Sequence, residues 1–437
     1  MESFFRTSEP DQALLMPGSP REWLPEGHLA HFISDTVDQL DLAAFYERYL
    51  KREHEKGEKA YHPRMLLKVL IYGYCVGVVS SRKIAGAIEE LVPLRYLAAG
   101  NAPNHRTIAR FREQNHGHFN SIFAQVVEVA RESNLITLGT LAVDGTRVKA
   151  NASKHKAMSY GRMQAASKKL RQEIRKIVRL AQATDKAEDE QFGPDFRGDE
   201  LPEELRSRKA RLAKIKEAMK RLEKKQDEED SDSGRGTGDR GPKLKRANGV
   251  PPDKAQTNFT DPESAIMKTA SKSFEQCYNG QIAVDAKEKI VVAADVTACA
   301  ADVDQLVPMV EAAERNTGLQ AKRVLADAGY KSEANFLALE RKGTEGYVAL
   351  RKGETAPQGS ASMQPATARM KRRLATKSGR RRYKLRKTVA EPPLGWIKRI
   401  LGFRSFSLRG LAKVRGEWNL VCLAGNLRRM NGMIAWR

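Results

Sequence analysis

The chain has 437 residues, of which 77 are lysine or arginine and 54 are aspartate or glutamate, so its formal net charge is +23. That length allows roughly two to four domains with a substantial core, and that charge favours a polyanionic partner. The longest apolar stretch, residues 69–79, is too short to cross a bilayer, and the N-terminus lacks a basic-then-apolar targeting pattern. Four scattered cysteines offer no zinc spacing and fit a reducing cytosol. We therefore expect a cytoplasmic protein that binds nucleic acid and no membrane.

Residues 20–130 carry mostly helical signals. The stretch "SSRKIAGAIEELVPLRYL" places apolar residues on one helical face, and "APNHRTIARFREQN" offers Asn104 as a cap for a short arginine-rich helix. Two short helices joined by a turn resemble a helix-turn-helix, although an ordinary surface helix pair fits equally well. Arg106 and Arg110 are four residues apart, so they share a face that can meet phosphates.

An apolar strand follows in "TLAVDGTRVKANAS". Leu141, Ala142 and Val143 deliver one carboxylate, Asp144, and the apolar run stops at Gly145. A lone acid after a buried strand is unusual in so basic a chain, so Asp144 is a candidate for a function.

Residues 157–228 predict two helices folded into an antiparallel pair. Apolar residues recur at steps of three, four and seven in each half, with a Gly/Pro break between them, which indicates a narrow apolar seam and charged outer faces. Residues 227–256 are poor in apolar side chains and rich in Gly, Pro and charge, which predicts a loosely held linker. This pair is open to three interpretations: a dimerisation arm, a DNA clamp or a mere insertion.

The remainder alternates between strands and helices. "YNGQIAVD" and "KIVVAADVT" predict a β-hairpin, "DVDQLVPMVEAAERNTG" a helix ending at Gly318, and "AKRVLADAGY" a strand ending at Asp327. A helix, a strand and a long helical end follow. A hairpin continued by β-α-β crossovers predicts a mixed α/β sheet covered by helices.

Asp144 and Asp327 share one pattern: an apolar strand, an acid and a nearby glycine. Parallel strands of one sheet would bring both carboxylates to the same edge, where two like charges repel. A divalent cation removes that cost, and Mg²⁺ prefers such oxygen ligands; two ions can assist phosphodiester chemistry. Strand-end capping is the competing explanation.

The third acid of the hypothesis is Glu391, in "TVAEPPLGWIKR". Lys398 lies two helical turns later on the same face, and Tyr383 and Arg386 precede it in a basic run. Cations there can hold a phosphate, and an aromatic ring can stack on a base. A solvated acid at a helix start is the alternative for Glu391.

These segments, together with "YKLRKTVAEPPLGWIKRILGFRSFSLRGLAKVRGEWNLVCLAGNLRRM", resemble the DDE transposases of bacterial insertion sequences. The resemblance implies a ribonuclease H-like sheet flanked by helices, and Mg²⁺- or Mn²⁺-dependent strand cleavage and transfer, with two ions, on double-stranded DNA by a homodimer. It puts the catalytic, metal-binding acids at Asp144, Asp327 and Glu391, and a Tyr-Arg-Glu-Lys signature at Tyr383, Arg386, Glu391 and Lys398. It also implies a bacterial, nucleoid-associated protein.

The expected organisation has three parts: a helical, helix-turn-helix-like DNA-binding domain at 1–132, a catalytic domain at 133–156 and 257–437, and a helical-hairpin insertion with its linker at 157–256. Two further interpretations remain. A catalytically inactive, sequence-specific DNA-binding protein derived from a transposase would use the arginines of 100–112 and 369–387 without metal. An RNA- or ribosome-associated protein would share the charge but need no acid trio.

Overall fold

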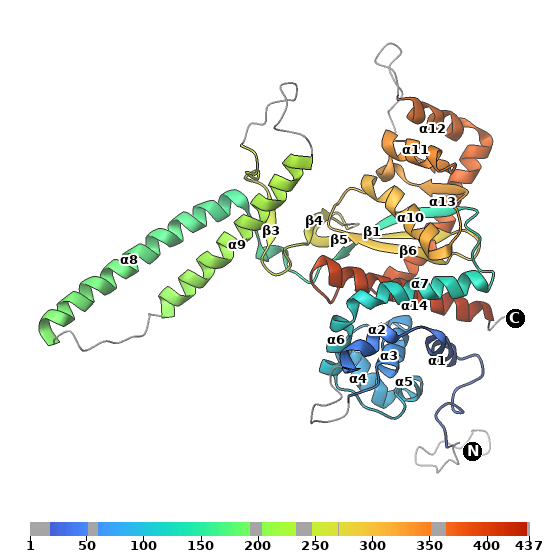
Figure 1. The fold of residues 1–437 in the computed structure, drawn as a ribbon, viewed down its shortest axis with the longest axis horizontal. Helices are drawn as coiled ribbons and strands as arrows, with labels where there is room; N and C mark the ends of the chain where they lie inside the picture. The colour runs from blue at the N-terminus through green and yellow to red at the C-terminus, as the bar shows by residue number, and fades with distance from the viewer. Residues whose placement is uncertain are drawn as a thin grey trace, which may run out of the picture.

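The computed structural model describes residues 18–50, 60–192, 203–232, 247–269, 271–350 and 364–434. Figure 1 shows a helical N-terminal part, a central sheet with helices packed around it, and two long helices that project away from that body. Within those ranges no helix is long and apolar enough to cross a membrane.

The N-terminal part is built of helices that share one core with the sheet. Apolar positions dominate α3, where eleven of 13 residues are buried, and Asn104 caps α6 by accepting a hydrogen bond from the Thr107 amide at 2.9 Å, as the sequence predicted. The helices are α1 (Leu29–Gln39), α2 (Ala43–Leu50), α3 (Pro63–Cys75), α4 (Ser81–Glu90), α5 (Val92–Leu97), α6 (His105–Gln114) and α7 (Phe119–Glu132). The helix predicted over residues 80–97 is divided in two, because Leu91 between α4 and α5 is extended. The helix-turn-helix assignment stays a prediction.

The central sheet is mixed. Its strands are β1 (Leu141–Lys149), β4 (Ala265–Lys268), β5 (Phe274–Asp285), β6 (Val291–Thr297), β7 (Arg323–Ala326) and β8 (Glu345–Val348). They lie in the order β4-β5-β1-β7-β8, with β6 also paired to β5. β5 is antiparallel to β1 and β6, whereas β1, β7 and β8 run parallel. A mixed sheet flanked by helices fits the expected ribonuclease H-like fold.

The alternation of strands and helices after residue 270 follows the prediction. β5 and β6 form the expected hairpin. α10 (Leu306–Thr317) ends at Gly318, whose φ of +65° is the left-handed conformation that glycine adopts without strain. β7, α11 (Glu333–Arg341) and β8 then follow in turn.

The opening strand is longer than its apolar run. β1 continues through Asp144 and Gly145 to Lys149, because β5 pairs with all nine of its residues. The prediction that Asp144 lies at the end of its strand is therefore wrong. Asp144 instead lies where β7, the neighbour on the other side, comes to its end.

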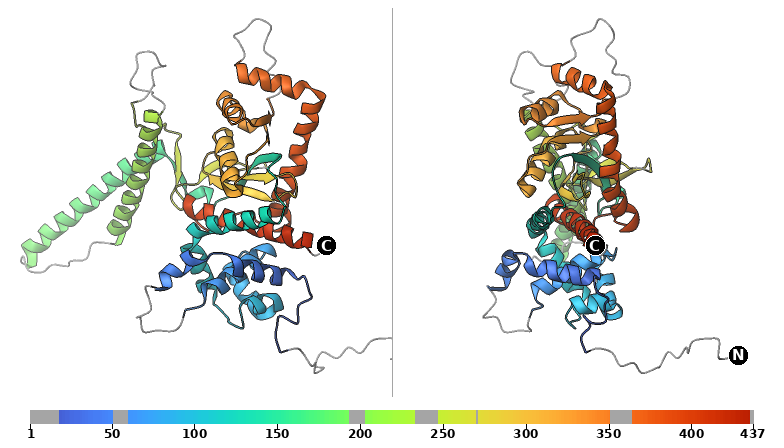
Figure 2. Two further views of the ribbon diagram at one scale, coloured as in Figure 1. Left: turned by 45° about the vertical axis from the view of Figure 1, so that its right-hand side comes forward. Right: turned by 90° about the vertical axis from the view of Figure 1, so that its right-hand side faces the viewer.

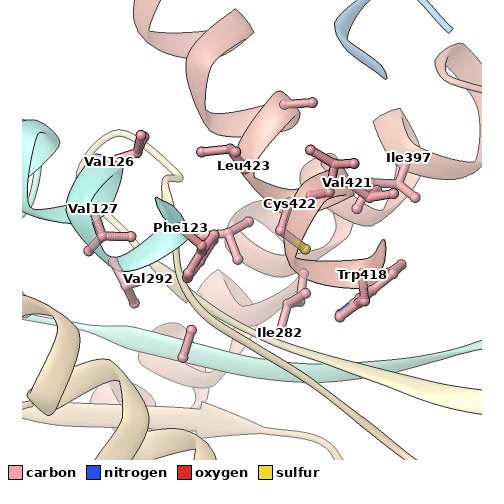
Figure 3. Packing of buried hydrophobic residues seen from close by; sticks show 14 of the residues in the cluster. Phe123, Val126, Val127, Ile282, Val292, Ile397, Trp418, Val421, Cys422 and Leu423 are labelled. Atoms are coloured by element: carbon pink, nitrogen blue, oxygen red, sulfur yellow. The ribbon is translucent and has the colours of Figure 1, made fainter. Parts of the chain in front are cut away.

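The body has one continuous hydrophobic core. Figure 3 shows side chains of α7, such as Phe123 and Val127, meeting side chains from the sheet and from the C-terminal helix. That helix, α14 (Leu411–Ile434), contributes Trp418, which is fully buried and donates its indole N–H to the Gln281 carbonyl at 3.0 Å. The helical N-terminus and the sheet are thus one packed unit.

The basic run before α14 is helical. It forms α12 (Pro365–Ala375) and α13 (Lys377–Gly395), and α13 passes into a π-helical turn at Trp396–Ile400. Pro392 and Pro393 lie inside α13. Each lacks the N–H that an α-helix needs, so the wider turn follows where the regular hydrogen-bond ladder is broken.

The two projecting helices are α8 (Tyr160–Phe192) and α9 (Glu203–Asp232), which pack along a separate seam formed by Met163, Leu170, Ile215 and Ala218. At their base, β2 (Ala157–Ser159) pairs with β3 (Gln256–Asn258). The predicted linker is therefore too long at both ends, since α9 includes residues 227–232 and β3 begins at Gln256. Residues 233–246 lie outside the described part.

Candidate active site

Adjacent parallel strands bring Asp144 and Asp327 together. In the β1–β7 register, Leu141 pairs with Val324 and Ala142 with Leu325. Two residues further on, Asp144 stands beside Asp327, just past the last residue of β7. The carboxyl ends of parallel strands are where α/β proteins gather polar ligands.

Asp144 is nearly buried, and both of its carboxylate oxygens have partners. Its side chain is only 14% exposed. One oxygen forms a 3.0 Å ion pair with Arg386 of α13, and the other accepts a hydrogen bond from the Gly145 amide at 2.9 Å. Burial raises the pKa of Asp144 above its ordinary value, Arg386 opposes that rise, and Asp327 adds to it. In this structure Arg386 therefore supplies the positive charge that a buried acid needs.

A third carboxylate, Asp302, belongs to this group. One of its oxygens accepts hydrogen bonds from the side-chain amides of Asn279 at 2.7 Å and Gln281 at 2.8 Å, both on β5. Asp302 is among the charges that raise the pKa of Asp144. A Cβ atom on Gly329 would lie 2.9 Å from an Asp327 oxygen and 3.0 Å from an Asp302 oxygen, so the two acids flank this glycine.

Sequence reasoning missed Asp302 because it follows a loop rather than an apolar strand. A weaker signal was available in "YNGQIAVD". Asn279 and Gln281 are two apart, so they lie on one face of β5, and their exposed fractions are 2% and 0%. Two buried amides on one strand face need polar partners, and Asp302 is that partner.

Tyr330 lies close to all three acids. Its ring is fully buried, and its hydroxyl donates to the Gln281 side-chain carbonyl. Burial raises the pKa of Tyr330, and the nearby charges of Asp302, Asp144 and Asp327 raise it further. The hydroxyl therefore stays protonated and fixes the amide that holds Asp302.

Gly145 is required by this packing. A Cβ there would lie 2.5 Å from the Gln281 amide nitrogen and 2.8 Å from an Asp302 oxygen. We expect Gly145→Ala to push Asp302 from its place and to cost about 1–3 kcal/mol of unfolding free energy, measured by urea denaturation. Gly139→Ala, whose added Cβ would meet only Thr137 at 3.7 Å, is the control. Equal stability of the two variants would contradict the packing argument.

The structure does not bring Glu391 into this group. Glu391 is exposed on α13. It lies five residues after Arg386, which is about 7.5 Å further along the helix and about 140° around it. No three His, Cys, Asp or Glu side chains among the described residues are arranged to hold a metal ion. The role of Glu391 as the third ligand stays a prediction.

The cations of the predicted signature do gather at Asp144. Burial alone would lower the pKa of Arg386, but Asp144, Tyr383 and Asp327 together outweigh burial, so the pKa of Arg386 is raised. Burial, with help from Arg147, lowers the pKa of Lys398, while Asp144 opposes that shift. Arg386 on α13 therefore contacts Asp144, and Lys398 on the π-helical extension lies close enough for Asp144 to act on its charge.

The arginines of α6 divide into two kinds. Arg106 and Arg110 are exposed, as a phosphate-binding role requires. Arg112 is 6% exposed and donates to the Tyr74 hydroxyl at 3.1 Å and the Val79 carbonyl at 3.0 Å. The expectation that all arginines of 100–112 are available to DNA is therefore wrong for Arg112, which is part of the core.

The chemistry of the adjacent pair, rather than a preformed three-acid site, suits a hard divalent cation. Asp144 and Asp327 offer carboxylate oxygens, which such cations prefer, and their mutual repulsion is relieved by positive charge.

Comparison with known families gives two matches. Residues 237–427 match the model of the transposase DDE domain, and residues 19–114 match the model described as a transposase domain (DUF772). No curated protein and no solved structure matches the chain.

Proposed function

We propose that this chain, whose two matched domains support a DDE-family transposase, binds the ends of an insertion sequence and cleaves and transfers DNA strands with divalent metal ions. The catalytic, metal-holding acids are Asp144, Asp327 and Glu391. The observation that carries the proposal is the β1–β7 register, which sets two acids side by side at the edge of a ribonuclease H-like sheet.

The proposed ions are Mg²⁺ or Mn²⁺, two per site, held by Asp144 and Asp327 with Glu391 completing the set. When bound, such ions activate the attacking oxygen and stabilise the leaving oxygen of a phosphodiester. Asp302 stands at the same edge, packed against Gly145 and Gly329. A metal ion bound at Asp144 would neutralise the carboxylate that Arg386 now pairs with. Arg386 would then be free to bind the phosphate together with Lys398.

Partners and organisation follow from this function. Arg106 and Arg110 on α6 are proposed to contact the phosphates of double-stranded DNA from the helical domain at 1–132. Tyr383 would stack on a base near the cut. A transposase acts on the two ends of its element together, so the proposed DNA-bound form is a homodimer. The net charge of +23 favours association with the nucleoid, and the proposed location is the bacterial cytoplasm.

The test is a divalent-ion titration on supercoiled plasmid. We expect conversion to the nicked form to require Mg²⁺ or Mn²⁺ and to stop when EDTA removes the ion, while duplex binding persists in EDTA. Binding should weaken linearly in log salt concentration, because phosphate contacts release counterions. Nicking that continues unchanged in EDTA would contradict the proposed metal chemistry.

The second candidate is a catalytically inactive DNA-binding protein derived from a transposase. The Arg386–Asp144 ion pair favours it, since a permanent pair would keep a cation away from the buried acid. This candidate predicts salt-dependent duplex binding with no nicking at any metal concentration, so the same titration separates the two.

A further inference from the structure

The projecting helices α8 and α9, with the β2–β3 pair at their root, form a unit that we call the arm (Figure 2). The seam between the helices is closed by Met163 and Ile215, which are 0% and 2% exposed. The Tyr160 hydroxyl donates to Glu223 at 2.6 Å and ties the start of α8 to α9. Because its apolar side chains meet each other, the arm presents polar faces to its surroundings.

Positive charge is concentrated in one part of each of the two helices. Residues 160–179 and 207–226 contain sixteen lysines and arginines against three glutamates, a net charge of +13. The remaining residues of α8 and α9 contain eleven acids and two cations, so the two helices together carry +4. Repulsion among the clustered cations opposes folding of the basic part, so that part favours an anionic partner.

Three of these cations form one row. Lys168, Arg171 and Arg175 follow each other at steps of three and four, so they lie along one side of α8, away from the seam. We call them the arm row. All three are exposed, and none makes an ion pair with any residue that the structure describes.

A cavity lies at the root of the arm, between α9 and the β4–β5 edge of the sheet. Its volume is about 870 Å³. Arg221, Lys225 and Lys254 line it from the arm, and Gln276 lines it from the sheet. Gln276 is six residues before Ile282, the partner of Asp144 in the sheet, so the cavity lies about 20 Å along β5 from that acid.

We propose that the arm is a second DNA-binding surface, which holds the sugar-phosphate backbone of a duplex whose neighbouring segment lies at the acids. This inference rests on the proposed function. The partner is double-stranded DNA recognised by its charge, because lysines and arginines on a regular helix face contact phosphates without reading bases. The basic part of α9, residues 207–226, is about 30 Å long, enough to follow roughly nine base pairs of a duplex.

The test removes the arm row by the triple substitution Lys168→Gln, Arg171→Gln and Arg175→Gln. The matched control is Arg315→Gln, Lys322→Gln and Arg341→Gln, three exposed cations at the opposite edge of the sheet from the acids. Both variants lose the same charge. The probe is a mixed-sequence DNA duplex of about 40 base pairs, titrated at several salt concentrations, with sedimentation to record the oligomeric state.

We expect the arm variant to bind the duplex about tenfold to a hundredfold more weakly at physiological salt, with a salt slope lower by roughly 2.7, and the control to match the unsubstituted protein. Equal effects of the two triple substitutions would overturn the inference. A changed oligomeric state with an unchanged salt slope would also overturn it, in favour of a second copy as the partner. If the unsubstituted protein neither binds nor nicks DNA, the proposed function fails. If the unsubstituted protein does both, but the arm variant binds DNA as tightly as the control variant does, the arm inference fails and the proposed function stands.

Discussion

Replacing Asp144 with asparagine should abolish plasmid nicking, lowering its rate by about a thousandfold or more, while leaving duplex binding intact. The substitution keeps the shape of the side chain and its hydrogen bond from the Gly145 amide but removes the negative charge. Burying the charge of Asp144 is unfavourable, as its raised pKa indicates, so the substitution removes that cost to folding. It also leaves Arg386 without its ion-pair partner. Nicking and binding are measured on the same preparation.

The same loss is expected for Asp327→Asn and for Glu391→Gln. The matched control is Asp295→Asn, on β6 of the same sheet, whose carboxylate pairs with Arg415 at 2.8 Å and is 40% exposed. It removes one carboxylate from the sheet without touching the acids, so nicking should stay within a factor of about two. Full cleavage by any of the three site variants would remove that residue from the catalytic set.

The adjacency of the two aspartates was predictable because it depends on a local pattern and a general rule. Each acid follows an apolar run long enough for a strand, and β-α-β connections make strands parallel, so the two ends meet. The end of α10 was predictable for a similar reason, since Gly318 takes the left-handed conformation that stops a helix. Such features need only a few neighbouring residues to specify them.

Features that depend on distant partners were not predictable. β1 reaches Lys149 because β5, more than a hundred residues later, supplies hydrogen bonds along its whole length. Asp302 joins the acids only because two amides of β5 hold its loop. Arg112 has the same local pattern as Arg106 and Arg110, yet a hydroxyl on α3 draws it into the core. In each case tertiary packing outweighs what the local sequence indicates.

The buried residue Glu417 joins the helical N-terminus to α14 and to the loop before it. Its side chain is 0% exposed on α14 and accepts the Tyr74 hydroxyl of α3 at 3.0 Å. The same carboxylate accepts the backbone amides of Ser407 at 2.9 Å and Leu408 at 3.0 Å. Arg112 of α6 supplies the compensating positive charge through Tyr74. Three helices and the loop before α14 therefore converge on one carboxylate.

We expect Glu417→Ala to lower the free energy of unfolding by about 3–5 kcal/mol, because it leaves a buried cation and several buried donors without their acceptor. Urea denaturation followed by circular dichroism measures the loss. Tyr74→Phe removes a single donor from the same carboxylate and should cost about 1–3 kcal/mol, so the network can be tested even where Glu417→Ala does not fold.

The control for this stability prediction is Glu113→Ala. Glu113 also joins α6 to α14, through an ion pair with Lys413, but its side chain is 52% exposed. Solvent screens exposed pairs, so its removal should cost at most about 1 kcal/mol. Both substitutions delete a glutamate that links α14 to a helix of the N-terminal part, α3 for Glu417 and α6 for Glu113, and the main difference between them is burial. A loss at Glu417 as small as that at Glu113 would mean that apolar packing alone holds α14 against the helical N-terminus.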